Sequence, residues 1–128
     1  MEISMKKLIF ITIFILGCNS KKEFLNTNLK NISIYEYIHT KDASQTIVNI
    51  SKIKVHTMYN IDSTDFIIHA LNKKHQEFAI FMPAYEIELN YRDTVKHVEV
   101  NGIYLKINGC TYETNKDLSE YLASLKKH

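Results

Sequence analysis

The amino-acid sequence predicts an α+β fold, in which an antiparallel β-sheet carries two helices packed on one face. The first observation is a series of short runs rich in β-forming residues, several of which alternate apolar and polar side chains as half-buried strands do. The second is the pair of dipeptides Asn101-Gly102 and Asn108-Gly109, which is typical of the hairpin turns of a meander. The third is two segments with the apolar spacing of amphipathic helices, one near residue 70 and one at the C-terminal end.

The N-terminal segment has the pattern of an export signal. Two lysines precede the apolar run 8–16, and the run ends at Gly17 and Cys18. A membrane-spanning helix needs about 20 apolar residues, whereas the apolar core of a signal peptide needs about 7–15. The length of this run therefore indicates a signal peptide.

The motif Ile15-Leu16-Gly17-Cys18 resembles the lipobox that ends the signal peptide of bacterial lipoproteins. The resemblance covers residues 1–18 alone. It implies that residues 1–17 are removed by cleavage between Gly17 and Cys18, and that the Cys18 sulfur carries a diacylglycerol thioether, which anchors the protein to a membrane. Asn19 stands where an aspartate retains Gram-negative lipoproteins at the inner membrane. The resemblance therefore implies a lipid-anchored protein of the bacterial cell envelope, at the outer rather than the inner membrane.

Composition constrains the rest of the chain. Residues 18–31 are rich in Asn, Lys and Ser and are expected to form a tether, which leaves residues 32–128 as a single α+β domain. Removal of residues 1–17 lowers the 16 basic and 14 acidic residues to 14 and 13, a net charge of +1. Such a balance argues against nucleic-acid binding, which needs a strongly basic surface. With Cys18 lipidated, we expect Cys110 to be a buried, inert thiol and the core to be held by packing without a disulfide.

The first half of the domain is predicted to form two strands and a helix. Residues 32–38 are expected to form the first strand. A long strand at 46–61 changes the phase of its apolar residues, which predicts a β-bulge near Ser51. The sequence Asp62-Ser63-Thr64-Asp65 then predicts the start of a helix that ends near His75.

Two further strands precede the hairpins, and a helix follows them. The continuous apolar run 77–82 predicts a strand buried on both faces. Strict alternation over 85–91 predicts a half-buried strand. After the hairpins, Thr114 and Asp117 resemble a capping box, and the apolar residues of 118–125 have helical spacing.

The two hairpin turns predict a register for the meander. The first turn is expected to pair Val100 with Ile103, and the second to pair Ile107 with Cys110. Both registers place the apolar residues on one face, which supports the assignment. Polar residues occupy the other face, and four of them combine tyrosine with mixed charge, a composition that binding surfaces favour. They form the candidate partner-binding face: His97, Glu99, Tyr104 and Lys106.

No residue spacing predicts a metal site, a cofactor or a catalytic set, but two groupings keep an alternative open. Asp65 and His69 lie one turn apart on the solvent side of the first helix, where they could serve a metal or acid–base site. Glu86 and Glu88 share the outer face of one strand, at a spacing compatible with the carboxylate pair of a glycosidase. The plainer interpretation of both groupings is a solvated surface.

The leading hypothesis is a small, non-enzymatic lipoprotein that binds a protein partner near the membrane. It is expected to be an immunity or inhibitor protein, or an accessory subunit of an envelope complex. The alternative is an envelope hydrolase or metal-binding protein that uses Asp65 and His69, or Glu86 and Glu88. A structural lipoprotein without any ligand is the third hypothesis.

Overall fold

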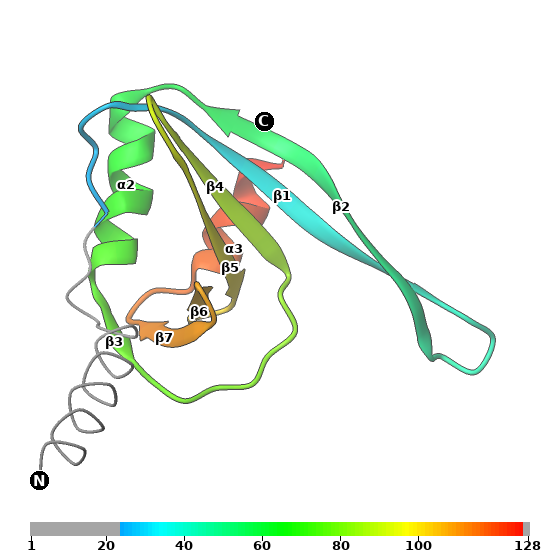
Figure 1. Ribbon diagram of the computed structural model, residues 1–128. Coiled ribbons are helices and arrows are strands. Elements are labelled where there is room, and N and C mark those ends of the chain that lie inside the picture. The colour runs from blue at the N-terminus through cyan, green and yellow to red at the C-terminus, as the bar shows by residue number, and fades with distance from the viewer. Residues whose placement is uncertain (1–23, 127–128) are drawn as a thin grey trace, which may run out of the picture.

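A computed structural model describes residues 24–126, so that the predicted export signal, with Gly17 and Cys18, lies outside the described residues. The described chain forms a seven-stranded antiparallel sheet with two helices (Figure 1). This confirms the predicted α+β fold. No helix within residues 24–126 is both long enough and apolar enough to span a bilayer.

The strands are ordered β2-β1-β4-β5-β6-β7-β3 across the sheet, so β2 and β3 form its two edges. Along the chain the elements are β1 (Leu29–Lys41), β2 (Ile47–Met58), α2 (Ile61–Asn72), β3 (Lys74–Gln76), β4 (Tyr85–Tyr91), β5 (Val95–Asn101), β6 (Tyr104–Ile107), β7 (Cys110–Thr114) and α3 (Leu118–Leu125). The alternation predicted for 85–91 therefore marks a real strand, β4.

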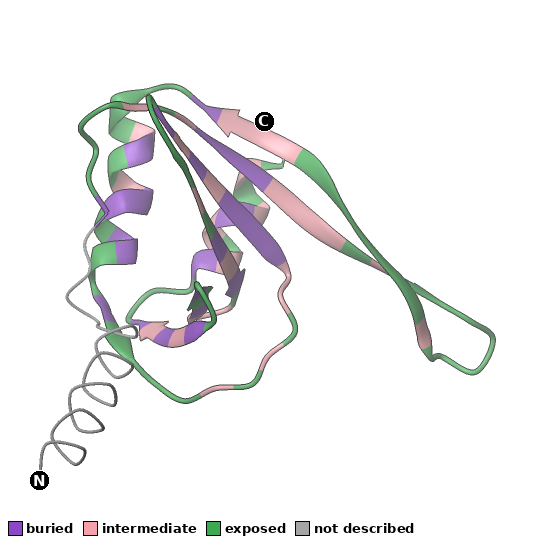
Figure 2. Ribbon diagram, in the orientation of Figure 1, coloured by how far each residue is buried: buried purple, intermediate pink, exposed green. Residues whose placement is uncertain are grey.

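One face of the sheet is buried, and both helices pack against it (Figures 1 and 2). Directly opposed residues of neighbouring strands point to the same face. The register places Ile34 opposite Ile87, and Ile87 opposite Val98, and all three are fully buried. Leu71 of α2 and Leu122 of α3 are fully buried in the same core. We call this the inner face and the opposite one the outer face.

Residues 24–31 also belong to the packed domain. Phe24 is buried in the core, and β1 begins at Leu29. The Phe24 backbone N–H donates to Oδ1 of Asn72 at 2.6 Å, and Nδ2 of Asn72 donates to the Phe24 carbonyl oxygen at 2.8 Å. The packed domain therefore starts before residue 32, because these interactions hold the preceding segment against α2.

Both helices begin at capping residues that differ from the predicted ones. The Asn60 side chain accepts a hydrogen bond from the Asp62 backbone N–H at 2.8 Å and caps α2. Asp117 caps α3 by accepting from the backbone N–H three residues later. Thr114 was the predicted cap, but it is the last residue of β7, and its hydroxyl donates to the Lys116 carbonyl oxygen. The prediction for Thr114 is wrong because the sheet extends one residue further than the hairpin pattern suggested.

The hairpin between β6 and β7 has the predicted register. Asn108 and Gly109 have φ values of 52° and 82°, as the two central residues of a type I′ turn require. Ile107 lies opposite Cys110. This pairing is confirmed.

The hairpin between β5 and β6 has a different register. Asn101 remains in β5, and Gly102 with Ile103 forms the turn. Val100 lies opposite Leu105, so the predicted pairing of Val100 with Ile103 is wrong. Because the register differs by two residues, and side chains alternate with a period of two, the same residues still point to the core.

Residues 77–84 connect β3 to β4 and are here called the strap. The prediction of a doubly buried strand at 77–82 is wrong, because the strap contains no strand and Phe81 stacks on Tyr104 of β6. At one end the Glu77 backbone N–H donates to the Thr111 carbonyl oxygen at 3.2 Å. At the other end Nδ2 of Asn101 donates to the Met82 carbonyl oxygen at 2.7 Å. Two of its apolar side chains are almost fully solvent-exposed: Phe78 (86%) and Ile80 (90%).

Residues 36–54, comprising the distal parts of β1 and β2 and the turn between them, are here called the arm. The arm extends away from both helices, and most of its residues are exposed (Figures 1 and 2). The register shifts that interrupt the β1–β2 pairing leave Val48 and Val55 unpaired in the ladder. Ser51 pairs regularly with Ile38, so the bulge predicted near Ser51 is wrong in position.

Candidate functional site

The polar residues of β4 and β5 meet on the outer face of the sheet. Glu88 lies opposite His97, and Glu86 lies opposite Glu99. These positions alternate with the buried residues Ile87 and Val98, which fill the core on the inner face. The same alternation that builds the core therefore places three carboxylates and an imidazole side by side.

Two carboxylates converge on one imidazole nitrogen. Nδ1 of His97 lies 3.3 Å from Oε1 of Glu86 and 4.0 Å from Oε2 of Glu88. Glu86 is buried, with 6% of its surface exposed, whereas Glu88 is partly exposed and His97 is exposed. We call these three residues the carboxylate–histidine cluster.

Lys52 neutralises the buried member of this cluster. Its Nζ donates to Oε2 of Glu86 at 2.5 Å, reaching across β1 from the edge strand β2. The hydrogen bond to Glu86 raises the pKa of Lys52 above its ordinary value. A buried carboxylate needs such a partner, because desolvation of an unpaired charge is costly.

The charges of this face also act on Tyr37, which lies opposite Lys52. The pKa of the Tyr37 hydroxyl is raised, first by burial and then by the negative charges of Glu86 and Glu99, while Lys52 opposes the shift. The negative charges of Glu86 and Glu99 therefore act on Tyr37 of the neighbouring strand β1, and Lys52 partly offsets them.

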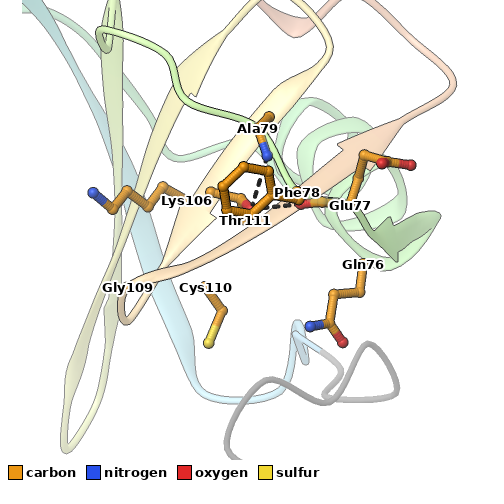
Figure 3. A pocket seen from close by; sticks show the side chains of 8 residues that line it. All are labelled: Gln76, Glu77, Phe78, Ala79, Lys106, Gly109, Cys110 and Thr111. Atoms are coloured by element: carbon orange, nitrogen blue, oxygen red, sulfur yellow. Dashed lines mark hydrogen bonds between the residues drawn. The ribbon is translucent and has the colours of Figure 1, made fainter. Parts of the chain in front are cut away.

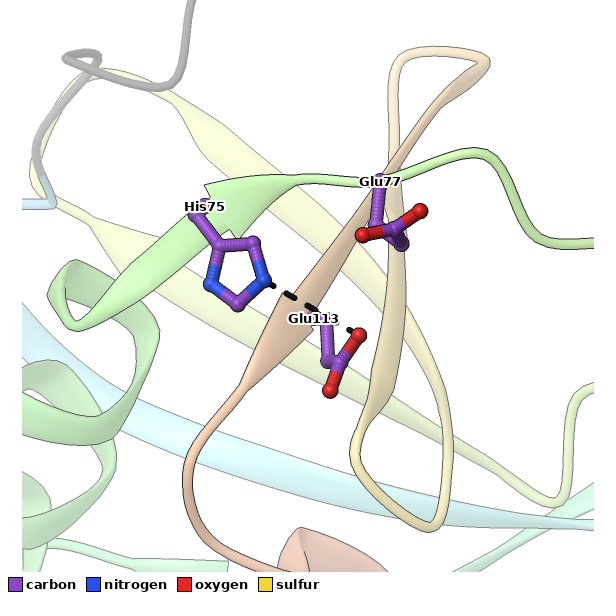
Figure 4. A group of neighbouring side chains, drawn as sticks. All are labelled: His75, Glu77 and Glu113. Carbon is purple, nitrogen blue, oxygen red and sulfur yellow. Dashed lines mark ion pairs between the residues drawn. The ribbon is translucent and has the colours of Figure 1, made fainter.

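A second grouping lies at the opposite edge of the sheet (Figure 4). His75 of β3 pairs with Glu113 of β7, and Nε2 of His75 lies 3.9 Å from Oε2 of Glu113. Glu77, at the start of the strap, is the third member. His75 and Glu77 are exposed and Glu113 is partly exposed, so this grouping has no buried ligand to hold its geometry.

A groove of about 360 Å³ lies between the strap and the β6–β7 hairpin (Figure 3). The Thr111 hydroxyl donates to the Glu77 carbonyl oxygen at 2.5 Å and ties the strap to the sheet. The charged ends of Lys106 and Glu77 point in opposite directions in Figure 3. The Thr111 hydrogen bond in this groove therefore has a structural role. The charged side chains among the residues that line the groove do not converge on one point.

The structure places the four residues of the predicted partner-binding face on the outer face, but it divides them. Glu99 lies opposite Lys106 in the ladder. Tyr104 stacks on Phe81 of the strap with ring centroids 6.1 Å apart, so the strap covers this part of the face. His97 belongs to the carboxylate–histidine cluster. The face is therefore two surfaces, one covered by the strap and one open.

The two groupings of the alternative hypothesis have different outcomes. Asp65 and His69 are both exposed on α2, and Oδ1 of Asp65 accepts from Nδ2 of Asn26 at 3.1 Å. Within residues 24–126 neither joins a set of three possible metal ligands. Glu86 and Glu88 do meet a third group, His97, and neither carboxylate lines the groove between the strap and the β6–β7 hairpin.

Cys110 is buried, as predicted, but it is not a thiol. Its sulfur is part of a disulfide, and Cys18, the only other cysteine of the sequence, lies outside the described residues. The expectation of a core without a covalent link is therefore wrong.

Sequence reasoning missed Lys52 as a site residue. Lys52 and Glu86 are 34 positions apart and lie on strands that are not neighbours in the sheet. No local pattern predicts such a contact, because it depends on the placement of β1 between them. Comparisons with protein-family models, curated proteins and solved structures gave no match to the chain. The interpretation of the site therefore rests on its geometry.

Proposed function

We propose that this protein is a small lipoprotein of the bacterial cell envelope, anchored through Cys18, that acts as a non-enzymatic protein-binding module. An extended, negatively charged segment of its partner pairs with the free edge of β2. The role is that of an immunity or inhibitor protein, or of an accessory subunit of an envelope complex. The anchor is at the outer membrane rather than the inner membrane.

The observation that carries the proposal is the long edge strand β2. It runs for 12 residues, from Ile47 to Met58, and within residues 24–126 its neighbour in the sheet is β1 alone. An edge strand presents backbone N–H and C=O groups that can pair with an added strand. Exposed Val48, Ile50 and Ile53 on the same strand offer apolar contacts to the side chains of that segment.

Charge selects the kind of partner. β2 contains Lys52 and Lys54 but neither aspartate nor glutamate. Lysines on an edge strand oppose pairing with a second copy of the same strand, because like charges would lie close together. Because Lys52 is already paired with Glu86, Lys54 is the lysine that favours a segment with acidic side chains.

The anchor limits where the partner lies. Phe24 is packed in the core, so residues 18–23 alone separate the domain from a lipidated Cys18. Six residues span at most about 20 Å when fully extended. The partner must therefore be a membrane protein or a protein held close to the membrane.

The anchor is tested by the intact mass of the protein extracted from bacterial membranes. We expect a chain that begins at Cys18 and carries a diacylglyceryl group, and we expect Cys18→Ala to abolish both the modification and the membrane association. Cys18 is the only cysteine of the sequence other than Cys110, and a Cys18 sulfur alkylated by lipid cannot also form a disulfide. The proposed anchored form therefore differs from this structure at the Cys110 disulfide. A mature chain that retains residues 1–17, or in which Cys18 is joined to Cys110, would therefore contradict the anchor.

The binding edge is tested by photo-crosslinking in intact cells. A photoreactive amino acid at position 50, on β2, is compared with the same amino acid at position 61, the first residue of α2, because Ile50 and Ile61 are both exposed. We expect a specific adduct from position 50 alone. Mass spectrometry should map the adduct to an extended acidic segment of the partner.

A charge reversal separates specific pairing from nonspecific capture. Lys54→Glu, combined with the photoreactive residue at position 50, should reduce the adduct at least tenfold. Lys30→Glu serves as the matched control, because Lys30 is an exposed lysine on the neighbouring strand β1, outside the arm. Equal adducts from positions 50 and 61, or an adduct that Lys54→Glu leaves unchanged, would rule out the proposed edge.

A further inference from the structure

We propose that Glu86, Glu88 and His97 form a binding site for a divalent transition-metal ion of the Zn²⁺ type. The three side chains supply one nitrogen and two carboxylate oxygens, and the remaining coordination position faces solvent. This site goes beyond the proposed partner binding and does not depend on it.

The separations of the ligand atoms fit one metal ion. Zinc lies about 2.0–2.2 Å from nitrogen and carboxylate ligands in tetrahedral sites, which separates two ligand atoms by roughly 3.4 Å. Nδ1 of His97 lies 3.3 Å from Oε1 of Glu86 and 4.0 Å from Oε2 of Glu88. One ligand atom from each of the three residues lies within 4.8 Å of the other two. A shift of a few tenths of an ångström in the side chain of Glu88, which is partly exposed, brings all three into range.

The scaffold holds these ligands in place. β4 and β5 are central strands of the sheet, and fully buried Ile87 and Val98 lie next to the ligands on the inner face. Lys52 occupies Oε2 of Glu86, which leaves Oε1 directed toward His97. Hydrogen bonds from a second layer of residues commonly orient metal-binding carboxylates in this way.

Charge also favours a cation here. Glu86, Glu88 and Glu99 share this part of the outer face. Lys52 pairs with Glu86, and Lys106 lies opposite Glu99. Glu88 is then the carboxylate whose charge a bound cation would balance. The neighbouring imidazole of His97 is a nitrogen ligand, which transition metals bind well, whereas Mg²⁺ and Ca²⁺ prefer oxygen ligands.

The site is tested by calorimetric titration of the full chain in detergent micelles with ZnCl₂. The protein is purified without a polyhistidine tag, since such a tag would itself bind zinc. We expect one Zn²⁺ per chain, with at least tenfold weaker binding in Glu88→Gln and in His97→Asn. MgCl₂ at equal concentration should not compete, because Mg²⁺ prefers six oxygen ligands.

The chain offers a matched control for these variants. Glu113→Gln removes a carboxylate from the other histidine–carboxylate grouping, at the β3–β7 edge, and should leave the affinity unchanged. Far-ultraviolet circular dichroism confirms that each variant is folded. If His97→Asn fails to fold, Glu88→Gln decides alone, because Glu88 is partly exposed and is not part of the core.

Three results would overturn the proposal. The first is no heat of binding at millimolar Zn²⁺. The second is zinc affinity that Glu88→Gln and His97→Asn leave unchanged, and the third is loss of binding in Glu113→Gln instead. In the first case the three side chains form a hydrogen-bonded and ion-paired surface only.

Discussion

The body of the domain and the arm are built from similar β-forming residues, yet they bury them to very different extents. Ile87, Val98 and Leu105 in the body are 0% exposed. Val48 and Ile50 in the arm are 61% and 51% exposed. The difference comes from the helices, because α2 and α3 cover the inner face of the body (Figures 1 and 2). The end of α3 meets the arm only at its base, where the C-cap residue Lys126 forms an ion pair with Glu36.

The comparison teaches that an apolar strand pattern predicts extended structure but does not by itself predict burial. A two-stranded ribbon has little stability of its own in water and usually needs a packed layer. The arm has β1 continuing into the body as its support, where β1 pairs with β4. Its apolar side chains are therefore available for contacts outside the domain, whereas those of the body maintain the fold.

Truncating one apolar side chain in the body and one in the arm should give the largest difference in unfolding free energy. Leu105→Ala should lower the free energy of unfolding by about 2–5 kcal/mol, through lost apolar burial and a cavity. Ile50→Ala should change it by less than about 0.5 kcal/mol, because the side chain is already half exposed. Urea unfolding followed by circular dichroism measures both. Equal losses in the two variants would mean that the arm belongs to the cooperative core.

Substitutions in the turns of the two regions should give a smaller difference in unfolding free energy. Gly109 has a φ of 82° and no atom within 4 Å of the position of an added Cβ, so Gly109→Ala introduces conformational strain without a clash. We expect a loss of about 1–2 kcal/mol in unfolding free energy. Gln45 has a φ of 66° in the turn of the arm, and Gln45→Gly should leave the global unfolding midpoint unchanged, since this turn is outside the core. A larger shift of the unfolding midpoint in Gln45→Gly than in Gly109→Ala would mean that the turn of the arm contributes more to global stability than the β6–β7 turn does.

Lys52 connects the arm to the body, so its removal tests whether the two regions are coupled. Lys52→Gln should cost about 1 kcal/mol, a modest value because the lysine side chain is 41% exposed. The pKa of Lys52 is raised in the folded state by Glu86, so this stabilisation is complete below the ordinary lysine pKa of about 10.4 and is lost as the pH rises through the folded value. The stability difference between the wild type and Lys52→Gln should therefore be constant from about pH 7 to 9 and decrease above about pH 10.4. Lys54→Gln on the same strand is the control, and a difference independent of pH would contradict the role of the ion pair.

The smallest effect is expected at the tip of the arm. Oδ1 of Asp42 accepts hydrogen bonds from the hydroxyl and the backbone N–H of Ser44 and from the backbone N–H of Thr46. The Ser44 hydroxyl bond is the largest cause of the lowered Asp42 pKa. The contribution of these bonds is present above the ordinary aspartate pKa and is lost as the pH falls through the lower, folded value. Nuclear magnetic resonance titration of the Ser44 and Thr46 amides should give a midpoint below that of an ordinary aspartate, without a change in global unfolding. A midpoint at or above the ordinary aspartate pKa would show that the turn is not formed in solution.

Local patterns were sufficient to predict much of the secondary structure. Strict alternation at 85–91 predicted β4, and the Asn108-Gly109 turn predicted the β6–β7 register, because both depend on backbone geometry within a few residues. The apolar run 77–82 failed for the opposite reason. An uninterrupted apolar segment can be a buried strand or an exposed connection, and only the position of the neighbouring layer distinguishes them.

The candidate site was likewise predictable from local patterns only in part. The polar face of β4 and β5 was predictable from alternation, and so were the exposed positions of Asp65 and His69. The convergence of Glu86 and Glu88 on His97 depends on the β4–β5 register, which no turn motif near those residues specifies. The contact of Lys52 with Glu86 also needs β1 to lie between β2 and β4.

Residue type and short-range spacing were enough to give the class of fold, the core-facing side of β4 and of the meander strands, and the lipobox pattern on which the proposed anchor rests. These features are set by residue type and by spacings of a few positions. Tertiary structure alone decided which apolar residues are exposed in the arm and the strap, and which charged residues meet on the outer face. The physical reason is that burial and charge contacts depend on strand order and on which face the helices cover, and both are properties of the assembled chain.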